Sequence, residues 1–447
     1  MSVVEYDDYG NLMNRAQMQG AVAAATEAAK TGGIVMVFVH GWHHNASKHA
    51  DRDGKVKDDD NLANFKLQVE RVAKAKELFR PADAKGRATE PHKKVLGIYV
   101  GWRGESIPNK GLTTPASYLL TFWGRKEAAH TIGLSGGVYE LFSRLSQIRA
   151  ETADAESKLI ITGHSFGGAV VYSSLSNALM EQIRSDGGPG AKPPPFADLI
   201  LLINPAFEAM RIRPQLDLAR RQEYPVSSKP RLIILTTDAD KATRLAFPVG
   251  RSLSTLFDRY ADAQSPDENR HAVGHHIPYV THQLIEKPSV ECLDGDASPL
   301  LAAPRPMFLD GTNGLQDLHQ ARRKPLCVER LDQFKDGVSK AKELELRRCD
   351  VQGDCTVVAG DHFIARGAVA TGLVPERLPI LNIRTTEAVM DGHNDLWNPT
   401  VENFALQLVL LASRGDEVPM FRYLPYTHRI NLGNPKLLEL PEVKPKE

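Results

Sequence analysis

The sequence predicts an α/β protein with a doubly wound, mostly parallel sheet, and three observations lead to this fold class. Short apolar runs of strand length alternate along the chain with stretches of helical periodicity. The runs are too uniformly apolar to have a solvated face, which is typical of strands buried between two helical layers. One run leads directly into Gly-x-Ser-x-Gly, a turn found where a strand of such a sheet passes into a helix.

The predicted elements follow from these patterns in chain order. Apolar runs predict strands at 34–40, 95–102, 159–162, 199–204, 232–236 and 378–383. Helical spacing and end signals predict helices at 17–30, at 62–72 before Pro81, at 169–180 after the serine turn, and at about 401–413 after Pro399. The strict alternation of the two kinds of element is what predicts a parallel sheet.

The domain organisation is predicted as a single α/β domain over 1–447, because folds of this class with insertions often reach this length. Two segments depart from the alternation. Segment 104–150 carries the apolar run 118–123 and is either a helical cap over the site or an ordinary packed helix pair. Segment 248–377 is long enough to be an insertion subdomain, and it holds all four cysteines.

Composition excludes several classes of function. The 55 basic and 55 acidic residues cancel, so nothing indicates a nucleic-acid partner. No apolar stretch reaches the roughly 18 residues that a membrane span needs, and the N-terminus is acidic, so we expect a cytoplasmic protein, or an exported one if a leader has been removed. Cys349 and Cys355 are close enough in sequence to pair in an oxidising compartment, or they stay reduced. The sequence leaves the oligomeric state open.

Ser165 is the candidate nucleophile. It lies in Gly163-His164-Ser165-Phe166-Gly167-Gly168, directly after the strand at 159–162 and before a helix. A serine hydroxyl reaches a carbonyl only from a tight turn, and Gly163 and Gly167 supply the room that the turn needs. The alternative for a bare Gly-x-Ser-x-Gly is a structural turn, and the strand and helix on either side favour the nucleophile.

Ser165 would need a base and an acid, and in this fold both lie after strands whose carboxyl ends meet at one edge. His393 follows the last strand and is the predicted base. Its rivals are His275, His276, His282 and His362, which all lie in the long insertion. For the acid, the strand at 232–236 leads to both Asp238 and Asp240. Asp240 lies deeper in the loop and is slightly preferred, while a helix cap explains either residue.

The oxyanion formed on attack needs two amide donors. The amide of Phe166 is the first, and the loop after the strand at 34–40 offers the amide of Trp42, where Gly41 lets the backbone turn. Four histidines gather near this loop, with Asp51 and Asp53 beyond: His40, His43, His44 and His49. They lack the helical His-Glu-x-x-His spacing, so we predict no metal here. The predicted serine chemistry also requires no cofactor.

Taken together, His-Gly-Trp at 40–42, Gly-His-Ser-Phe-Gly-Gly at 163–168 and the order Ser165, Asp240, His393 resemble the α/β-hydrolase superfamily. The resemblance is to its lipase- and esterase-like serine hydrolases, and the phrases around 40–46, 240–248 and 392–399 are similar to a poorly characterised bacterial group. It covers about 17–247 and 378–413 and supports Asp240 over Asp238. The insertion at 248–377 is far longer than the usual link between acid and histidine.

The predicted function is hydrolysis of carboxylic esters through an acyl-enzyme, with a small-molecule or lipid-like substrate whose acyl chain and alcohol stay open. An acyltransferase would use the same three residues and deliver the acyl group to another alcohol or thiol. A third alternative, from another class, is a non-catalytic binding module on a hydrolase fold, with the insertion as the recognition surface.

Overall fold

The computed structural model describes residues 1–42, 44, 46, 49–50, 56–57, 59–78, 88, 92–102, 115–153, 156–187, 194–224, 229–255, 258–286, 344–349, 355–359 and 378–412. The described strands of the main sheet are β1 (Ser2–Tyr6), β2 (Ile34–Val39), β5 (Val95–Trp102), β6 (Lys158–His164), β7 (Leu199–Ile203), β8 (Leu232–Thr237), β9 (His282–Glu286), β10 (Leu344–Cys349), β11 (Cys355–Ala359) and β12 (Ile380–Thr385). Two further short strands, β3 (His49–Ala50) and β4 (Val56–Lys57), pair with each other.

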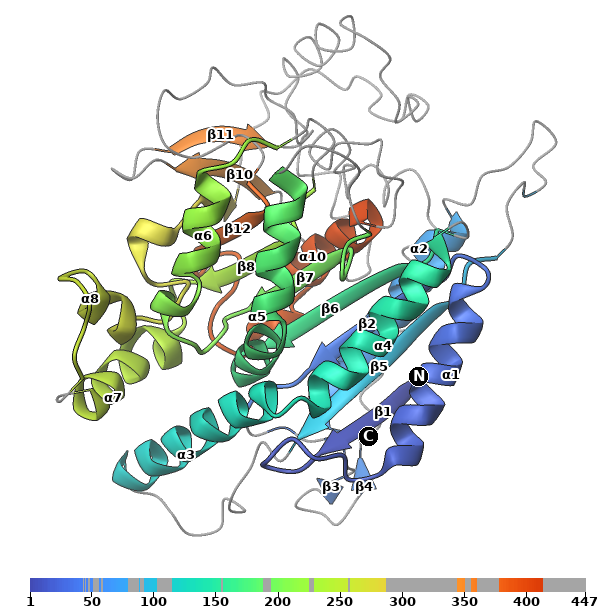
Figure 1. Cartoon of the computed structure of the whole chain (residues 1–447), viewed down its shortest axis with the longest axis horizontal. Helices are drawn as coiled ribbons and strands as arrows, with labels where there is room; N and C mark the ends of the chain where they lie inside the picture. The colour runs from blue at the N-terminus through green and yellow to red at the C-terminus, as the bar shows by residue number, and fades with distance from the viewer. Residues whose placement is uncertain are drawn as a thin grey trace, which may run out of the picture.

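The main sheet has the order β1-β5-β2-β6-β7-β8-β12-β9-β10-β11 (Figure 1). From β1 to β9 every neighbouring pair is parallel, and β10 and β11 are added antiparallel at the edge. The predicted doubly wound, mostly parallel α/β sheet is therefore confirmed. All residues of β2, β7 and β8 are buried, as their uniformly apolar sequences require.

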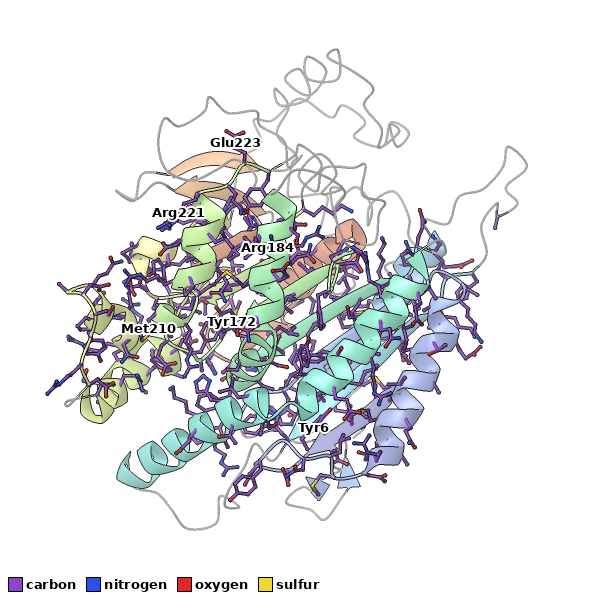
Figure 2. All side chains as sticks on the ribbon, in the orientation of Figure 1. Tyr6, Tyr172, Arg184, Met210, Arg221 and Glu223 are labelled. Carbon is purple, nitrogen blue, oxygen red and sulfur yellow. The ribbon has the colours of Figure 1, made fainter. Side chains whose placement is uncertain are left out.

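Helices cover both faces of this sheet. They are α1 (Arg15–Ala29), α2 (Asp60–Leu78), α3 (Pro115–Leu134), α4 (Gly137–Glu151), α5 (Phe166–Gly187), α6 (Arg213–Arg220), α7 (Phe247–Ser254), α8 (Ser265–Arg270) and α10 (Pro399–Ala412). In Figure 1, α1, α4, α5 and α6 lie in front of the sheet, whereas α2 and α10 pack together behind it. Tyr172 of α5, labelled in Figure 2, stacks on Phe207 at 4.4 Å and donates a hydrogen bond to Arg211 O at 2.8 Å. These contacts tie the loop after β7 to α5.

The order of the strands creates a switch point between β2 and β6. After β2 the chain continues to β5 on one side, and after β6 it continues to β7 on the other. Because the two strands are parallel neighbours, with Val39 opposite Gly163, their carboxyl ends open side by side. Sheets of this class bind ligands at such a point. The loop with Trp42 and the turn with Ser165 both begin there.

The two predicted irregular segments are described in part. In the first, α4 packs on α1 and β6, and α3 packs on α5; the side chains of 115–123, and with them the apolar run, lie outside the described residues. In the second, β9, β10 and β11 extend the sheet beyond β12. The cap and the single-domain organisation stay predictions.

Cys349 and Cys355 are register partners on β10 and β11. Among the described helices, none combines the length and apolar character that crossing a bilayer requires.

Candidate active site

Ser165 occupies the turn between β6 and α5. Its φ of +55° is left-handed, a conformation that costs a residue with a Cβ roughly 1–2 kcal/mol. The turn is fixed from the end of β7, because the Ser165 amide donates to Ile203 O at 3.0 Å and the Ala206 amide donates to Ser165 O at 3.1 Å. Strain held in this way by neighbouring backbone is a feature of functional turns.

Glycines permit the close approach of backbone around this turn. A Cβ added at Gly167 would lie 2.1 Å from Val39 O, and one added at Gly163 would lie 2.8 Å from Gly167 O. A Cβ at Gly41 would lie 2.8 Å from the Cβ of Ser165. Side chains at these positions would push the β2 loop away from the serine. Gly163 and Gly167 are the two glycines of the predicted turn, and their role in presenting the serine stays a prediction.

Ser165 is the first of three side chains, from separate parts of the chain, that contact one another in a row. His393 Nε2 lies 2.7 Å from Ser165 Oγ, and His393 Nδ1 lies 2.8 Å from Asp240 Oδ2. Asp240 is fully buried, and Ser165 is 4% exposed. The arrangement is that of a nucleophile bonded to a base, which a carboxylate orients in turn.

The second candidate acid, Asp238, lies elsewhere. Its carboxylate pairs with Arg384 of β12, and its side chain is 39% exposed. The reason is local: β8 continues to Thr237, so Asp238 is still bonded to the neighbouring strand, where its amide donates to Thr385 O at 2.9 Å. Asp240 follows in the turn, where the chain is free to direct a carboxylate toward His393.

The loop that carries His393 is held by two side chains that sequence reasoning did not identify. The carbonyl of His393 accepts a hydrogen bond from His164 Nε2 at 2.9 Å and one from Asn204 Nδ2, also at 2.9 Å. Asn204, at the end of β7, has a φ of +45°, and its Oδ1 accepts from the Thr237 amide. Asn204 is the last residue of the predicted strand 199–204 and directly follows β7, so a polar residue at the end of a strand is the signal that points to it.

Burial and hydrogen bonds set the charges of the site. Burial alone would raise the pKa of Asp240, but the electrostatic interaction with His393 and hydrogen bonds from His393 and Thr243 lower it to about 2. Burial lowers the pKa of His164 to about 3, so this ring is neutral at pH 7. Asp240 is therefore ionised, and it faces the Nδ1–H of His393 as an acceptor.

The loop after β2 is anchored beside Ser165. His40 O accepts from Trp102 Nε1 at 2.8 Å, and His40 Nε2 accepts from the Trp102 amide at 3.0 Å. Beyond Gly41, the ring of Trp42 lies 6.5 Å from the ring of Phe166, the first residue of α5. The rings of the two residues predicted as amide donors thus lie near each other, and the role of their amides at an oxyanion stays a prediction.

The rival histidines have other partners. His275 Nε2 lies 2.9 Å from Thr243 Oγ1, on the far side of Asp240. His276 Nδ1 lies 3.3 Å from Asp267, and His282 Nδ1 bonds to Thr281 Oγ1. His362 lies outside the described residues. Sequence order alone did not reveal that His275 joins the same chain of contacts as the acid.

The histidines and carboxylates of the described residues offer few groups that could hold a metal. Of the histidines near the β2 loop, His40 is bonded to backbone and His44 to Asp59, while the side chains of His43, His49, Asp51 and Asp53 lie outside the description. One group has donor atoms within 4.8 Å of one another: Asp267, His271 and His276. The carboxylate of Asp267 lies between the two rings, 3.2 Å from His271 Nδ1 and 3.3 Å from His276 Nδ1.

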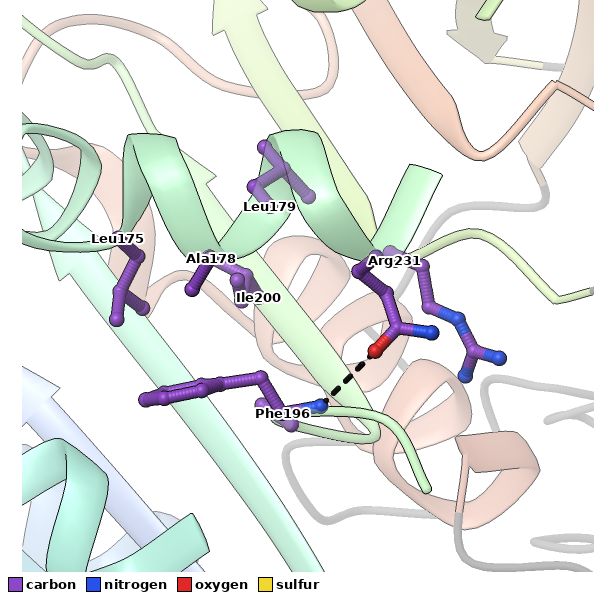
Figure 3. A pocket seen from close by; sticks show the side chains of 8 residues that line it. Leu175, Ala178, Leu179, Phe196, Ile200 and Arg231 are labelled. Atoms are coloured by element: carbon purple, nitrogen blue, oxygen red, sulfur yellow. Dashed lines mark hydrogen bonds between the residues drawn. The ribbon is translucent and has the colours of Figure 1, made fainter. Parts of the chain in front are cut away.

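A small pocket lies on the side of α5 that faces β7 (Figure 3). Its lining is mostly apolar, and Gln182 closes one end by accepting a hydrogen bond from the Phe196 amide at 3.2 Å. None of its lining residues belongs to the Ser165 site. It is a packing gap between a helix and the sheet.

Comparison with known proteins adds little to this geometry. No protein-family model matches the chain, and no curated protein matches it. A solved structure, phospholipase PlaB from Legionella pneumophila in complex with thio-NAD, is similar at 9% sequence identity and a TM-score of 0.22. The match covers 57% of this chain and 46% of that chain, less than half its length. A score this low supports neither a shared fold nor a shared activity.

Proposed function

We propose that the protein is a serine hydrolase of carboxylic esters and a member of the α/β-hydrolase superfamily. The observation that carries the proposal is the continuous contact from Ser165 Oγ through both nitrogens of His393 to the buried carboxylate of Asp240, at 2.7 and 2.8 Å. The left-handed turn at Ser165 supports it further, because it holds the hydroxyl at the carboxyl edge of the sheet.

The first half of the reaction forms an acyl-enzyme. Ser165 Oγ attacks the ester carbonyl while His393 Nε2 takes its proton, and Asp240 stabilises the imidazolium through Nδ1–H. The amides of Trp42 and Phe166 donate to the oxyanion. When the tetrahedral intermediate collapses, the C–O bond to the alcohol breaks, and the proton on Nε2 goes to the departing alkoxide.

The second half regenerates the enzyme. His393 Nε2 removes a proton from water as its oxygen attacks the acyl carbon, and a second tetrahedral intermediate forms. Its collapse breaks the bond to Ser165 Oγ, which recovers the proton from Nε2, and the carboxylic acid leaves. In this scheme His393 takes up and returns each proton, and the backbone amides of Trp42 and Phe166 provide the hydrogen bonds to the oxyanion.

Labelling with a fluorophosphonate tests the proposal. We expect the reagent to modify Ser165 in folded protein, and p-nitrophenyl esters of increasing chain length to be hydrolysed. Ser165→Ala should remove labelling and lower kcat by at least about 10⁴-fold. The matched control is Ser173→Ala on α5, where the serine contacts His130 instead. A folded wild-type protein that resists the reagent and turns over none of the esters would refute the proposal.

A further inference from the structure

Asp240 has a second set of contacts besides the one with His393. Its Oδ1 accepts from the Thr243 amide at 3.0 Å, and its Oδ2, which accepts from His393, also accepts from Thr243 Oγ1. Thr243 Oγ1 in turn lies 2.9 Å from His275 Nε2. All three residues are buried: Asp240, Thr243 and His275 are 0%, 1% and 9% exposed.

The chemistry of the groups fixes the direction of these bonds. An ionised carboxylate only accepts, so the Thr243 hydroxyl must donate its one proton to Asp240. The hydroxyl oxygen is then an acceptor toward His275, which must carry its proton on Nε2. Burial lowers the pKa of His275 to about 4, so the ring is neutral at pH 7 and holds this single tautomer. The donors therefore run in order from His275 through Thr243 to Asp240.

The backbone on both sides of this contact is specialised. Thr243 lies in a π-helix at Ala242–Ala246, a rare conformation that is frequent at functional sites. The His275 turn is pressed onto the sheet: a Cβ at Gly274 would lie 1.9 Å from Thr236 Oγ1. Asn382 Nδ2 of β12 donates to Val273 O at 2.9 Å and to Tyr279 O at 3.1 Å. His275 is thus fixed by core strands although it belongs to the insertion.

We propose that Thr243 and His275 are positioning residues for Asp240, so that the long insertion supplies a histidine that acts on the site from behind the acid. The idea rests on the proposed hydrolase function. Each added donor on Oδ2 takes up part of the negative charge that would otherwise draw the Nδ1 proton of His393. The pair also prevents the carboxylate from rotating, which keeps His393 aligned with Ser165.

Charged groups near His275 and His393 affect the pH dependence of activity. His275 faces Asp240 and Asp238 as negative groups and Arg384 and Arg244 as positive groups. His393 faces Ser165, Asp240 and the neutral ring of His164. Replacing Thr243 by valine removes a neutral hydroxyl, so the substitution itself changes no formal charge at neutral pH.

Two pairs of variants test the proposal. Thr243→Val keeps the shape and removes the hydroxyl, whereas Thr243→Ser keeps it; His275→Met removes the donor, whereas His275→Gln keeps one at the position of Nε2. We expect kcat/KM for ester hydrolysis to fall roughly 10- to 100-fold in Thr243→Val, by analogy with hydrogen bonds to charged groups. The loss in His275→Met is smaller, about threefold, since it acts through the hydroxyl. Thr243→Ser and His275→Gln should restore most of the activity.

Two readouts separate positioning from stability. The acidic limb of the kcat/KM profile should move to higher pH in Thr243→Val, because a carboxylate with fewer donors stabilises the His393 imidazolium more strongly. In resting protein, the downfield proton resonance of His393 Nδ1–H should shift in Thr243→Val and His275→Met and return in the conservative variants. Thermal unfolding would confirm that all four variants are folded.

Failure of the positioning role can be distinguished from failure of the proposed hydrolase function. If wild type neither reacts with the fluorophosphonate nor hydrolyses esters, the hydrolase proposal fails. The His393 Nδ1–H resonance then still tests whether Thr243 and His275 act on Asp240. If wild type is active while Thr243→Val and His275→Met match it in rate, pH profile and resonance, the positioning role is wrong. Equal losses in Thr243→Val and Thr243→Ser would also overturn it, since the serine hydroxyl should rescue.

Discussion

His164 Nε2 and His393 O are 2.9 Å apart, so the residue before the proposed nucleophile is bonded to the backbone of the proposed base. Asn204 Nδ2 donates to the same carbonyl. One end of the β12 loop is therefore fixed by side chains that end β6 and β7. This geometry lets a histidine that lies 228 residues from Ser165 along the chain keep a 2.7 Å contact with it.

The first prediction concerns the two candidate acids. Asp240→Asn should lower kcat by about 10⁴-fold, because an amide cannot hold the tautomer of His393 that accepts the serine proton. Asp238→Asn is the matched control: its partner is Arg384, and its side chain is 39% exposed, so kcat should change less than about threefold. Steady-state kinetics on an ester that wild type hydrolyses measures both. Similar losses in the two variants would contradict the assignment of Asp240.

The second prediction is a pH dependence of stability. The pKa of Asp240 is lowered to about 2 in the folded protein, against about 3.9 in an unfolded chain. Because the folded value is the lower one, the stabilisation is fully present above the unfolded pKa and is lost as pH falls through about 2. Denaturant titrations from about pH 5 to 2 should therefore show a steeper fall in unfolding free energy for wild type than for Asp240→Asn. Parallel curves would show that Asp240 contributes no such dependence.

The third prediction concerns Asn204. Its carboxamide holds the His393 carbonyl and the Thr237 amide, so Asn204→Gly and Asn204→Ala should both lower kcat by roughly tenfold. The two variants should differ in stability, because φ at position 204 is +45° and glycine tolerates this conformation. The free energy of unfolding of Asn204→Ala should be about 1 kcal/mol lower than that of Asn204→Gly. Kinetics and unfolding of both variants provide the comparison. Normal kcat in Asn204→Gly would mean that His164 alone positions the loop.

The fourth prediction tests the packing between β2 and α5. Gly167→Ala places a Cβ 2.1 Å from Val39 O, which must shift backbone, and we expect a loss of at least about 3 kcal/mol or insoluble protein. Gly20→Ala in the exposed middle of α1 meets no atom within 4 Å and should gain about 0.5–1 kcal/mol. Chemical denaturation compares the two. A Gly167→Ala protein as stable as wild type would contradict the close approach.

Prediction from sequence succeeded where the determinant is local. The six apolar runs became strands of the core, and the Gly-x-Ser-x-Gly turn joined β6 to α5. Within the main sheet, the strands that the sequence does not predict are β1 and β9 to β11, and they lie toward the two ends of the sheet order. In β1, for example, buried Val4 and Tyr6 alternate with partly exposed residues. Edge strands need not be apolar on both faces, so the pattern used for central strands passes over them.

The sequence by itself determined the sheet class, the serine turn and the set of histidines and carboxylates from which a site could be built. These depend on neighbours in the chain, through strand burial, helix periodicity and the steric needs of a left-handed turn. Only the tertiary structure decided that Asp240 rather than Asp238 meets His393, that Asn204 and His164 hold the loop, and that His275 lies behind the acid. A hydrogen bond depends on tenths of an ångström between groups that may lie hundreds of residues apart, and strand order and loop path set that separation.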